Sequence, residues 1–371
     1  MKITFPHMGN AYIAVKVLLD GLDLDYYMPP VGDRQDFERG IENSPEFMCL
    51  PFKAILGNFL NGLDHGADTI LFGGGCGQCR LSYYGDLQKE ILKSMGYKFN
   101  YIHLTLNHLT YREVMNKLGP FIENRSKAKI TKAVTEAAWT VFAVDGIYSK
   151  ASHIRPREVK HGETDSAMQH FEKRVRTERG FKNIRDAVFE AKNSLDAIKL
   201  DPHANPLKIG LIGEIYISSE PFCNLGIEKK LGNLRADVFN TMSVSMWIKK
   251  HFVDAIVPIH AKDRAVEAAQ PYMHIEDIGG HGVNTIGNAA LMSKDGLDGI
   301  IQIYPFSCMP EIIAQSAFRD IEKKYGVPIM TLIVDEQTAE AGYITRLEAF
   351  TDMLEMRREM KCKTMAGKIG A

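Results

Sequence analysis

Short apolar runs and stretches of helical periodicity alternate at the start of the chain. The runs that predict strands are 2–6, 24–28, 69–72 and 97–104, and the stretches that predict helices are 12–22, 53–66 and 81–95. Short connections between alternating strands and helices are typical of a parallel, doubly wound sheet. The pattern therefore predicts an N-terminal α/β lobe over residues 1–105, which ends with the CxxC loop and one further strand.

The pattern then becomes helical as far as residue 206. Alanine-rich amphipathic stretches cover 128–144 and 166–198, and a polar segment at 148–163 separates them. A linker with two prolines, 201–206, closes this part of the chain. We expect residues 106–206 to form a helical insert.

The alternation of strands and helices returns in the last part of the chain. Predicted strands lie at 208–212, 236–239, 299–304 and 328–334, and predicted helices at 224–231, 241–252, 284–293, 310–324 and 343–360, the last followed by a basic tail. Continuous apolar runs of this length are typical of buried parallel strands. We therefore expect a second α/β lobe over 207–371, with a C-terminal helix, and a fold of the α/β class.

Composition and charge narrow the function classes. Lys plus Arg number 45 and Asp plus Glu 46, so no strong net charge favours nucleic acid or an anionic membrane surface. No stretch approaches the ~18–20 apolar residues that a membrane span needs, and the first residues carry no hydrophobic export signal. We expect a cytoplasmic protein whose six cysteines are reduced thiols, available as metal ligands or redox groups.

A glycine-rich CxxC loop carries the strongest chemical signal. It holds Cys76 and Cys79 between a predicted buried strand and a predicted helix. Ligands of open α/β sheets bind at the carboxyl ends of the strands, so this loop faces the expected cleft. Gly75 and Gly77 permit close backbone approach to a bulky cofactor, and Arg80 with the helix N-terminus favours thiolates. These three residues are predicted to bind the cofactor.

Two other loops also place a cysteine just before a predicted helix. Cys308 follows the strand of the second lobe at 299–304, and Cys49 precedes the helix at 53–66. If the lobes face each other, all these loops meet at one cleft. The predicted metal ligands are Cys49, Cys76, Cys79 and Cys308. Cys223 follows a strand and remains open as a further ligand, whereas Cys362 lies in the polar tail and is interpreted as non-functional.

Three chemistries compete for these cysteines. An iron–sulfur cluster needs three or four thiolates from converging loops, which the four predicted ligands supply. A dithiol redox centre would use the CxxC alone, although no Trp precedes its first cysteine as in thioredoxin-like motifs. Structural zinc usually pairs two CxxC motifs that are close in sequence, and here the partner cysteines are single and distant. The spacing favours iron–sulfur over the other two.

Several polar residues near predicted strand ends could give protons to a substrate in the cleft. We select His281, Glu214 and Glu336 as candidate catalytic residues, and His281 lies between glycines. Tyr216 and Glu311 occupy similar places. For each of them the alternative is a helix cap or a hydrogen bond between the lobes. No P-loop, dinucleotide-binding motif, H-E-x-x-H or G-x-S-x-G occurs, so the chain has no nucleotide-hydrolysing motif of its own.

The chain resembles the 2-hydroxyacyl-CoA dehydratase superfamily, and within it the acyl-CoA dehydratase activase-related, or CoA-protein-activase-like, branch. The similar segments follow one another along almost the whole chain: Cys49–Lys53, Cys76–Arg80 with Tyr83 and Tyr84, Gly213–Tyr216, Gly279–Gly282, Tyr304–Glu311, Asp335–Thr338 and Thr345–Phe350. Gln78 stands where Pro is commoner, and Gln337 and Ala339 where His and Gly are more usual. None of these departures involves a cysteine.

The resemblance implies two flavodoxin-like, parallel-sheet lobes and an oxygen-sensitive iron–sulfur protein. It implies a [4Fe–4S] cluster, or in some homodimeric relatives a double-cubane [8Fe–9S] cluster, and low-potential electrons from a separate ATP-hydrolysing iron–sulfur activator protein. A double cubane would need about six thiolates. This chain has six cysteines with Cys362 badly placed, so a single [4Fe–4S] cluster is preferred.

The functional hypothesis is a low-potential reductase, or a reductive dehydratase, that acts on a small substrate in the cleft between the lobes. Its partners are the activator protein, the small-molecule substrate and a second copy in a homodimer, with no nucleic acid and no membrane. The non-enzymatic alternative is an electron carrier or cluster-delivery protein without its own substrate. An open iron site beside a closed polar pocket would favour the enzyme, and a buried, four-thiolate cluster the carrier.

Overall fold

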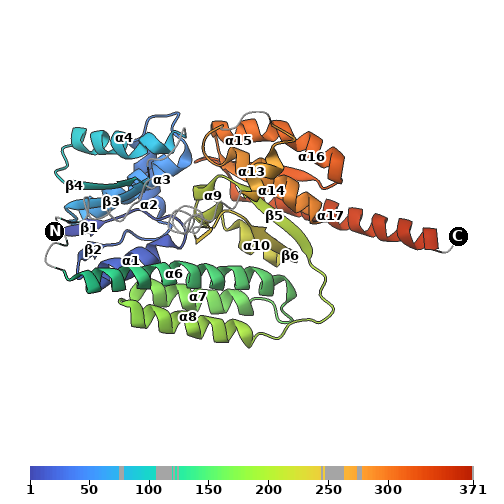
Figure 1. The fold of residues 1–371 in the computed structure, drawn as a ribbon, viewed down its shortest axis with the longest axis horizontal. Coiled ribbons are helices and arrows are strands. Elements are labelled where there is room, and N and C mark those ends of the chain that lie inside the picture. Colours follow the sequence, from blue (N-terminus) through green and yellow to red (C-terminus); the bar gives the residue numbers. More distant parts are fainter. Residues whose placement is uncertain are drawn as a thin grey trace.

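The strands form two separate four-stranded sheets in which every pairing is parallel. The computed structural model describes residues 1–74, 79–105, 119, 122, 125–243, 245–246, 263–273 and 278–369 (Figure 1). The first sheet contains β1 (Lys2–Thr4), β2 (Asp25–Tyr27), β3 (Thr69–Gly74) and β4 (Asn100–Thr105) in the order β2-β1-β3-β4. The second contains β5 (Leu207–Gly213), β6 (Ala236–Asn240), β7 (Gly299–Pro305) and β8 (Ile329–Val334) in the order β6-β5-β7-β8. The prediction of an α/β fold with parallel sheets is confirmed.

The two sheets repeat one topology. In each, the first strand pairs with the second on one side and the third on the other, as Ile3 does with Tyr26 and Thr69. The strand order therefore reverses between the first and third strands of each sheet. At such a point the loops leaving the carboxyl ends diverge and leave room for a ligand. Cys79 and Cys308 lie in the loops that follow the third strands, β3 and β7.

Four helices belong to the first sheet: α1 (Ala11–Gly21), α2 (Arg34–Glu42), α3 (Leu50–Asp64) and α4 (Leu81–Ser94). The sequence pattern did not indicate α2, because this helix is polar and buries only Asp36 and Gly40. Its packing depends on close backbone approach rather than on an apolar face. A Cβ atom on Gly40 would lie 2.0 Å from the carbonyl oxygen of Lys53, and one on Gly57 would lie 2.1 Å from that of Asp36.

Between the two sheets in sequence, the helices with described bounds are α6 (Lys127–Ile154), α7 (Glu163–Thr177) and α8 (Phe181–Asp196), with the short 3-10 turn η2 (Arg155–Arg157) after α6. The predicted break at 148–163 starts too early, because α6 continues to Ile154 and ends where Pro156 enters the turn. The predicted single helix at 166–198 is two helices. They are separated at Gly180, whose φ of 78° the helix cannot accommodate.

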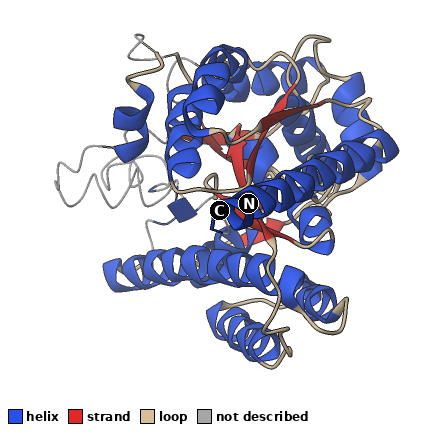
Figure 2. Cartoon of the chain, turned by 90° about the vertical axis from the view of Figure 1, so that its right-hand side faces the viewer, coloured by secondary structure: helices blue, strands red, loops and turns tan. Residues whose placement is uncertain are grey.

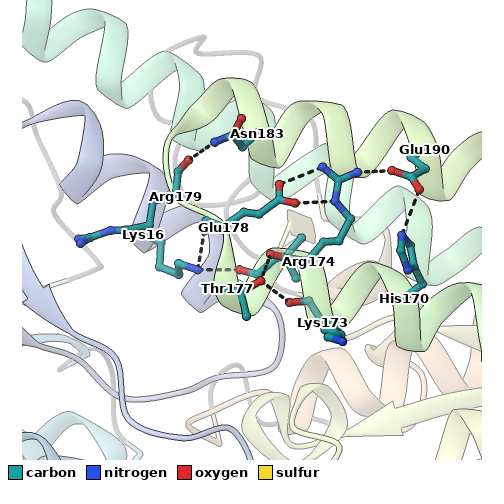
Figure 3. Close-up of polar contacts among 10 residues, drawn as sticks. Lys16, His170, Lys173, Arg174, Thr177, Glu178, Arg179, Asn183 and Glu190 are labelled. Carbon is teal, nitrogen blue, oxygen red and sulfur yellow. Dashed lines mark hydrogen bonds and ion pairs between the residues drawn. The ribbon is translucent and has the colours of Figure 1, made fainter.

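Lys16 fastens α1 to this helical segment. Its side chain is only 2% exposed, and Nζ donates to the carbonyl oxygens of Val175 (2.6 Å), Arg176 (2.9 Å) and Glu178 (3.0 Å) at the end of α7 (Figure 3). A cation at a helix C-terminus meets the negative end of the helix dipole and the carbonyls that lack intrahelical partners. The segment is therefore a fixed part of the first lobe's core.

The helices of the second sheet are α9 (Ile215–Ser219), α10 (Ile227–Asn233), α13 (Arg264–Ala269), α14 (Gly282–Lys294), α15 (Met309–Ala314), α16 (Phe318–Tyr325) and α17 (Glu340–Ile369), with a 3-10 turn η4 (Gln315–Ala317) between α15 and α16. Helices surround the strands in the end-on view (Figure 2). The short helix α9 was not predicted, and the single helix predicted at 310–324 is α15, η4 and α16. The helix predicted at 241–252 falls mostly outside the described residues.

The C-terminal helix is longer than predicted and includes the expected basic tail. Tyr343, Leu347, Phe350 and Leu354 form its buried stripe at helical spacing. Beyond Leu354 the helix leaves the body of the molecule (Figure 1), and Met356 and Met360 are exposed there. Among the described residues, no helix is long and apolar enough to cross a membrane.

The two α/β lobes share one buried core. Phe52 and Phe59 of α3 belong to the same cluster of buried residues as Leu211 of β5 and Ile301 of β7. Polar contacts reinforce this packing, because the backbone N–H of Gly9 donates to the Glu220 carboxylate at 2.8 Å. The lobes are therefore held as one unit, with the carboxyl ends of both sheets fixed relative to each other.

Glu220 makes this lobe contact sensitive to pH. Burial raises its pKa from 4.5 to about 7. The folded state binds this proton more tightly than the unfolded state, so the stabilisation by protonation is lost as pH rises through 7. Between pH 6.5 and pH 8, the free energy of unfolding of the wild type should therefore fall by about 1 kcal/mol more than that of Glu220→Gln.

Denaturant titrations at several pH values, with the exposed Glu348→Gln as the matched control, measure this difference. The buried imidazole of His7, whose pKa burial lowers from 6.5 to about 4, acts in the opposite direction below pH 6.5. The wild type and Glu220→Gln should therefore be compared above pH 6.5. Equal pH slopes for the wild type and Glu220→Gln would contradict the prediction.

Candidate cysteine site between the lobes

Three cysteines lie at the starts of three helices. Cys49 is the N-cap residue of α3 and Cys308 that of α15, and each is followed two residues later by a proline in the first helical turn. Cys79 lies two residues before α4 begins at Leu81. Proline suits the first turn because its missing N–H has no helical partner there. The same local pattern, a cysteine at the N-cap followed two residues later by proline, thus occurs at Cys49 in one lobe and at Cys308 in the other.

Arg80 ties the three cysteine segments together. Its guanidinium donates to the carbonyl oxygen of Phe47 at 3.3 Å, and to both the carbonyl and the hydroxyl oxygen of Ser307 at 2.9 Å. Phe47 lies two residues before Cys49, Ser307 precedes Cys308, and Arg80 itself follows Cys79. Arg80, one of the residues predicted to bind the cofactor, therefore connects the backbone segments that carry the three thiols.

Glu214 is central to this group. It lies at the carboxyl end of β5, and its carboxylate caps α9 by accepting from the N–H groups of Tyr216 (3.0 Å) and Ile217 (2.9 Å). Burial raises the pKa of Cys49 to about 12 and also raises the pKa values of Cys79 and Cys308. The Glu214 charge contributes to all three shifts. The Glu214 carboxylate therefore lies within electrostatic range of all three thiols, and its charge acts on Cys223 as well.

The glycine loop that contains His281 lies beside the same thiols. His281 is the N-cap residue of α14. A Cβ atom on the preceding residue, Gly280, would lie 3.2 Å from Cγ of Pro310 and 3.8 Å from Cβ of Cys79. The structure therefore brings the glycine loop that contains this candidate catalytic residue next to Cys79.

Glu311 forms a buried polar network beneath Cys308. The carboxylate, 1% exposed, accepts from the Thr285 hydroxyl at 3.0 Å and from the Gln302 amide at 2.8 Å. Burial raises the pKa of Glu311 to about 7. A carboxyl group of this kind can hold a proton at neutral pH, which is the property expected of a proton donor.

Glu336 occupies a different place from the other predicted catalytic residues. Its carboxylate forms an ion pair with Nζ of Lys53 at 2.6 Å, and the Lys53 side chain is 3% exposed. Lys53 lies in α3, one turn beyond Cys49, and Glu336 follows β8 of the other lobe. The contact between Lys53 and Glu336 therefore links the two lobes. Such a link was the alternative to a catalytic role for Glu336.

The structure describes only some of the remaining cysteines and predicted cofactor-binding residues. Gly75, Cys76 and Gly77 lie outside the described residues. Cys223 is buried, and the charges of Glu220 and Glu214 act on it. Cys362 is exposed on the projecting part of α17. Of the cysteines that the structure describes, Cys49, Cys79 and Cys308 are therefore the ones whose backbone segments are linked through Arg80.

The donor set is of the kind that an iron–sulfur cluster uses. Cys49, Cys79 and Cys308 are free cysteines, and Arg80 links the backbone segments that carry them. In a cluster the sulfur ligands bind different iron atoms and can be further apart than around one zinc ion. The residues present are thus compatible with an iron–sulfur cluster whose remaining ligand would be Cys76.

Sequence reasoning assigned no role to Tyr84, which the structure places on the site. Its hydroxyl lies 2.5 Å from the Cys49 sulfur. The signal was present, since Tyr83 and Tyr84 belong to one of the segments that carry the family resemblance, but adjacent tyrosines do not reveal which one faces inward. The three-dimensional contact distinguishes them.

The basic run at 173–185 is largely paired within the protein. Arg174 contacts Glu178 and Glu190 (Figure 3), and Arg179 contacts Asp20 at 3.1 Å. Internal carboxylates therefore already compensate much of the charge on this helical surface. This pairing favours a solvated helix face over a docking surface for an acidic partner.

Two surface hollows lie away from the cysteines. One of about 590 Å³ is lined by residues of α6, α8 and β6, including His153, Arg157 and Asp237. Another of about 460 Å³ lies between α7 and α8.

Comparison with known proteins adds no family assignment. Neither the protein-family models nor the curated proteins contain a match to this chain.

Proposed function

We propose that this chain is an iron–sulfur protein of the 2-hydroxyacyl-CoA dehydratase type, built from two flavodoxin-like lobes that face each other. The observation that supports the proposal is that Arg80, next to Cys79, donates hydrogen bonds to the segments that carry Cys49 in one lobe and Cys308 in the other. Thiolates delivered by converging helix starts are the ligands that iron–sulfur clusters use. These cysteines with Cys76 would hold a single [4Fe–4S] cluster.

The placement of the other cysteines is consistent with one cubane rather than a double one. An [8Fe–9S] cluster would need about six thiolates, extrapolating from four for each simple cubane. Cys362 is exposed on a helix that leaves the body of the molecule. The chain then has too few suitably placed cysteines for the larger cluster.

When bound, the cluster would supply one-electron transfer, and the surrounding residues would control protons and access. Burial raises the pKa of Glu311 to about 7, so this carboxyl group can hold a proton at neutral pH, and burial raises the pKa of Glu214 as well. His281 lies in the adjacent glycine loop. The proposed reaction is reduction, or reductive dehydration, of a small substrate beside these residues, with electrons from an ATP-hydrolysing activator protein.

The electron carrier remains the second candidate function, and one observation favours it. Cys308 is buried, and Cys49 and Cys79 are only partly exposed. Four thiolates around a buried cluster would leave no open iron site for a substrate, which fits a carrier. The reductase and the carrier share the same cluster ligands and differ in whether a substrate is consumed.

Anaerobic purification and reconstitution with iron and sulfide test the shared part of the proposal. We expect about four iron and four sulfide per chain, with an EPR signal from the cluster after reduction by dithionite. A colourless protein that binds stoichiometric zinc, or iron without sulfide, would contradict the proposal. Substrate turnover with added activator would then separate the reductase from the carrier.

A further inference from the structure

Tyr84 is held firmly against the proposed cluster ligand Cys49. It lies in the first turn of α4 with its side chain 2% exposed. The ring packs edge-on against Phe52, with centroids 4.9 Å apart and planes at 85°. Phe52 belongs to α3, the helix that Cys49 caps. The same two helices thus fix both the sulfur and the hydroxyl that contacts it.

The direction of this hydrogen bond follows from the chemistry of the two groups. A tyrosine hydroxyl keeps its proton at neutral pH, whereas a metal-bound cysteine is a thiolate with no proton to give. The hydroxyl is therefore the donor and the sulfur the acceptor whenever Cys49 ligates a metal. The 2.5 Å separation of Tyr84 Oη and Cys49 Sγ places the donor in reach.

We propose that Tyr84 is a positioning residue for the cluster: its hydroxyl donates to the Cys49 sulfur, orients that ligand and raises the reduction potential of the site. This inference rests on the proposed function, because it requires Cys49 to ligate the cluster. Hydrogen bonds to cluster sulfurs stabilise the more negative, reduced form. Loss of the donor therefore lowers the reduction potential and loosens the ligand.

The chain offers a matched control at the next position. Tyr83 is 62% exposed, so Tyr83→Phe removes a hydroxyl from the same helical turn without touching the site. Tyr84→Phe keeps the ring that packs on Phe52 and removes only the donor. The two variants therefore isolate the hydrogen bond from the aromatic packing.

Both variants are reconstituted, and their reduction potentials are measured by spectroelectrochemistry. We expect Tyr84→Phe to have a more negative potential than wild type and to lose iron to a chelator about tenfold faster, while Tyr83→Phe matches the wild type. Thermal melts of the metal-free proteins check that all three are folded. A Tyr84→Phe protein with wild-type potential and wild-type iron loss would overturn the assignment of Tyr84.

The two proposals fail in distinguishable ways. If neither the wild type nor either variant takes up iron and sulfide, the proposed function fails. If all take up the cluster and Tyr84→Phe behaves as Tyr83→Phe does, the cluster stands and the role of Tyr84 is wrong.

Discussion

Replacing Cys308 by serine is expected to abolish assembly of the iron–sulfur cluster. Cys308 is the second-lobe thiol whose neighbour Ser307 accepts hydrogen bonds from Arg80. Serine has nearly the same shape but is a poor ligand for iron in such clusters. Iron and sulfide analysis after anaerobic reconstitution should fall from about four of each per chain to well below one.

Two other cysteine variants serve as controls for this experiment. Cys362→Ser changes an exposed residue on α17 and should retain the full cluster. Cys223→Ser tests a buried thiol that lies near Glu214 but outside the group tied by Arg80, and it should also retain iron. Full iron and sulfide content in Cys308→Ser would show that the second lobe does not supply a ligand.

Replacing Lys16 by methionine is expected to cost about 3 kcal/mol of unfolding free energy. Burial lowers the pKa of Lys16 to about 8, so the amine is still mainly protonated at pH 7 and gives its three N–H bonds to the end of α7. Methionine has a similar length but leaves three carbonyl oxygens without their donor. A buried acceptor that loses its partner carries its full desolvation cost.

Denaturant unfolding at pH 7 measures this effect, with Lys182→Met as the control at an exposed position of α8. The control should change stability by less than about 0.5 kcal/mol. A Lys16→Met protein as stable as the control would mean that water replaces the amine at the α7 terminus.

The fold could be predicted well where burial leaves a local pattern. The strand at 299–304 lies in β7, because a strand covered on both faces reads as a continuous apolar run. The helix α2 could not be predicted in this way, since its contact with α3 is made through Gly40 and Gly57. Nor could the length of α17, whose buried stripe ends at Leu354 while the helix continues.

The site was predictable in its residue types and less so in its contacts. Cysteines before predicted helices indicated Cys49, Cys79 and Cys308 individually. The bond from Arg80 to Ser307 and the ion pair of Lys53 with Glu336 join residues more than two hundred positions apart. No local pattern encodes such contacts, because they depend on how the lobes dock. That is why Glu336 was interpreted as a catalytic candidate although the structure pairs it with a lysine.

The repeated strand order has a consequence for how the site is assembled. Cys79 and Cys308 follow corresponding strands of two sheets with the same topology. If these cysteines ligate the proposed cluster, each half of the chain contributes only part of the coordination shell. Insertion of the cluster would then follow docking of the halves, and the inserted cluster would resist their separation.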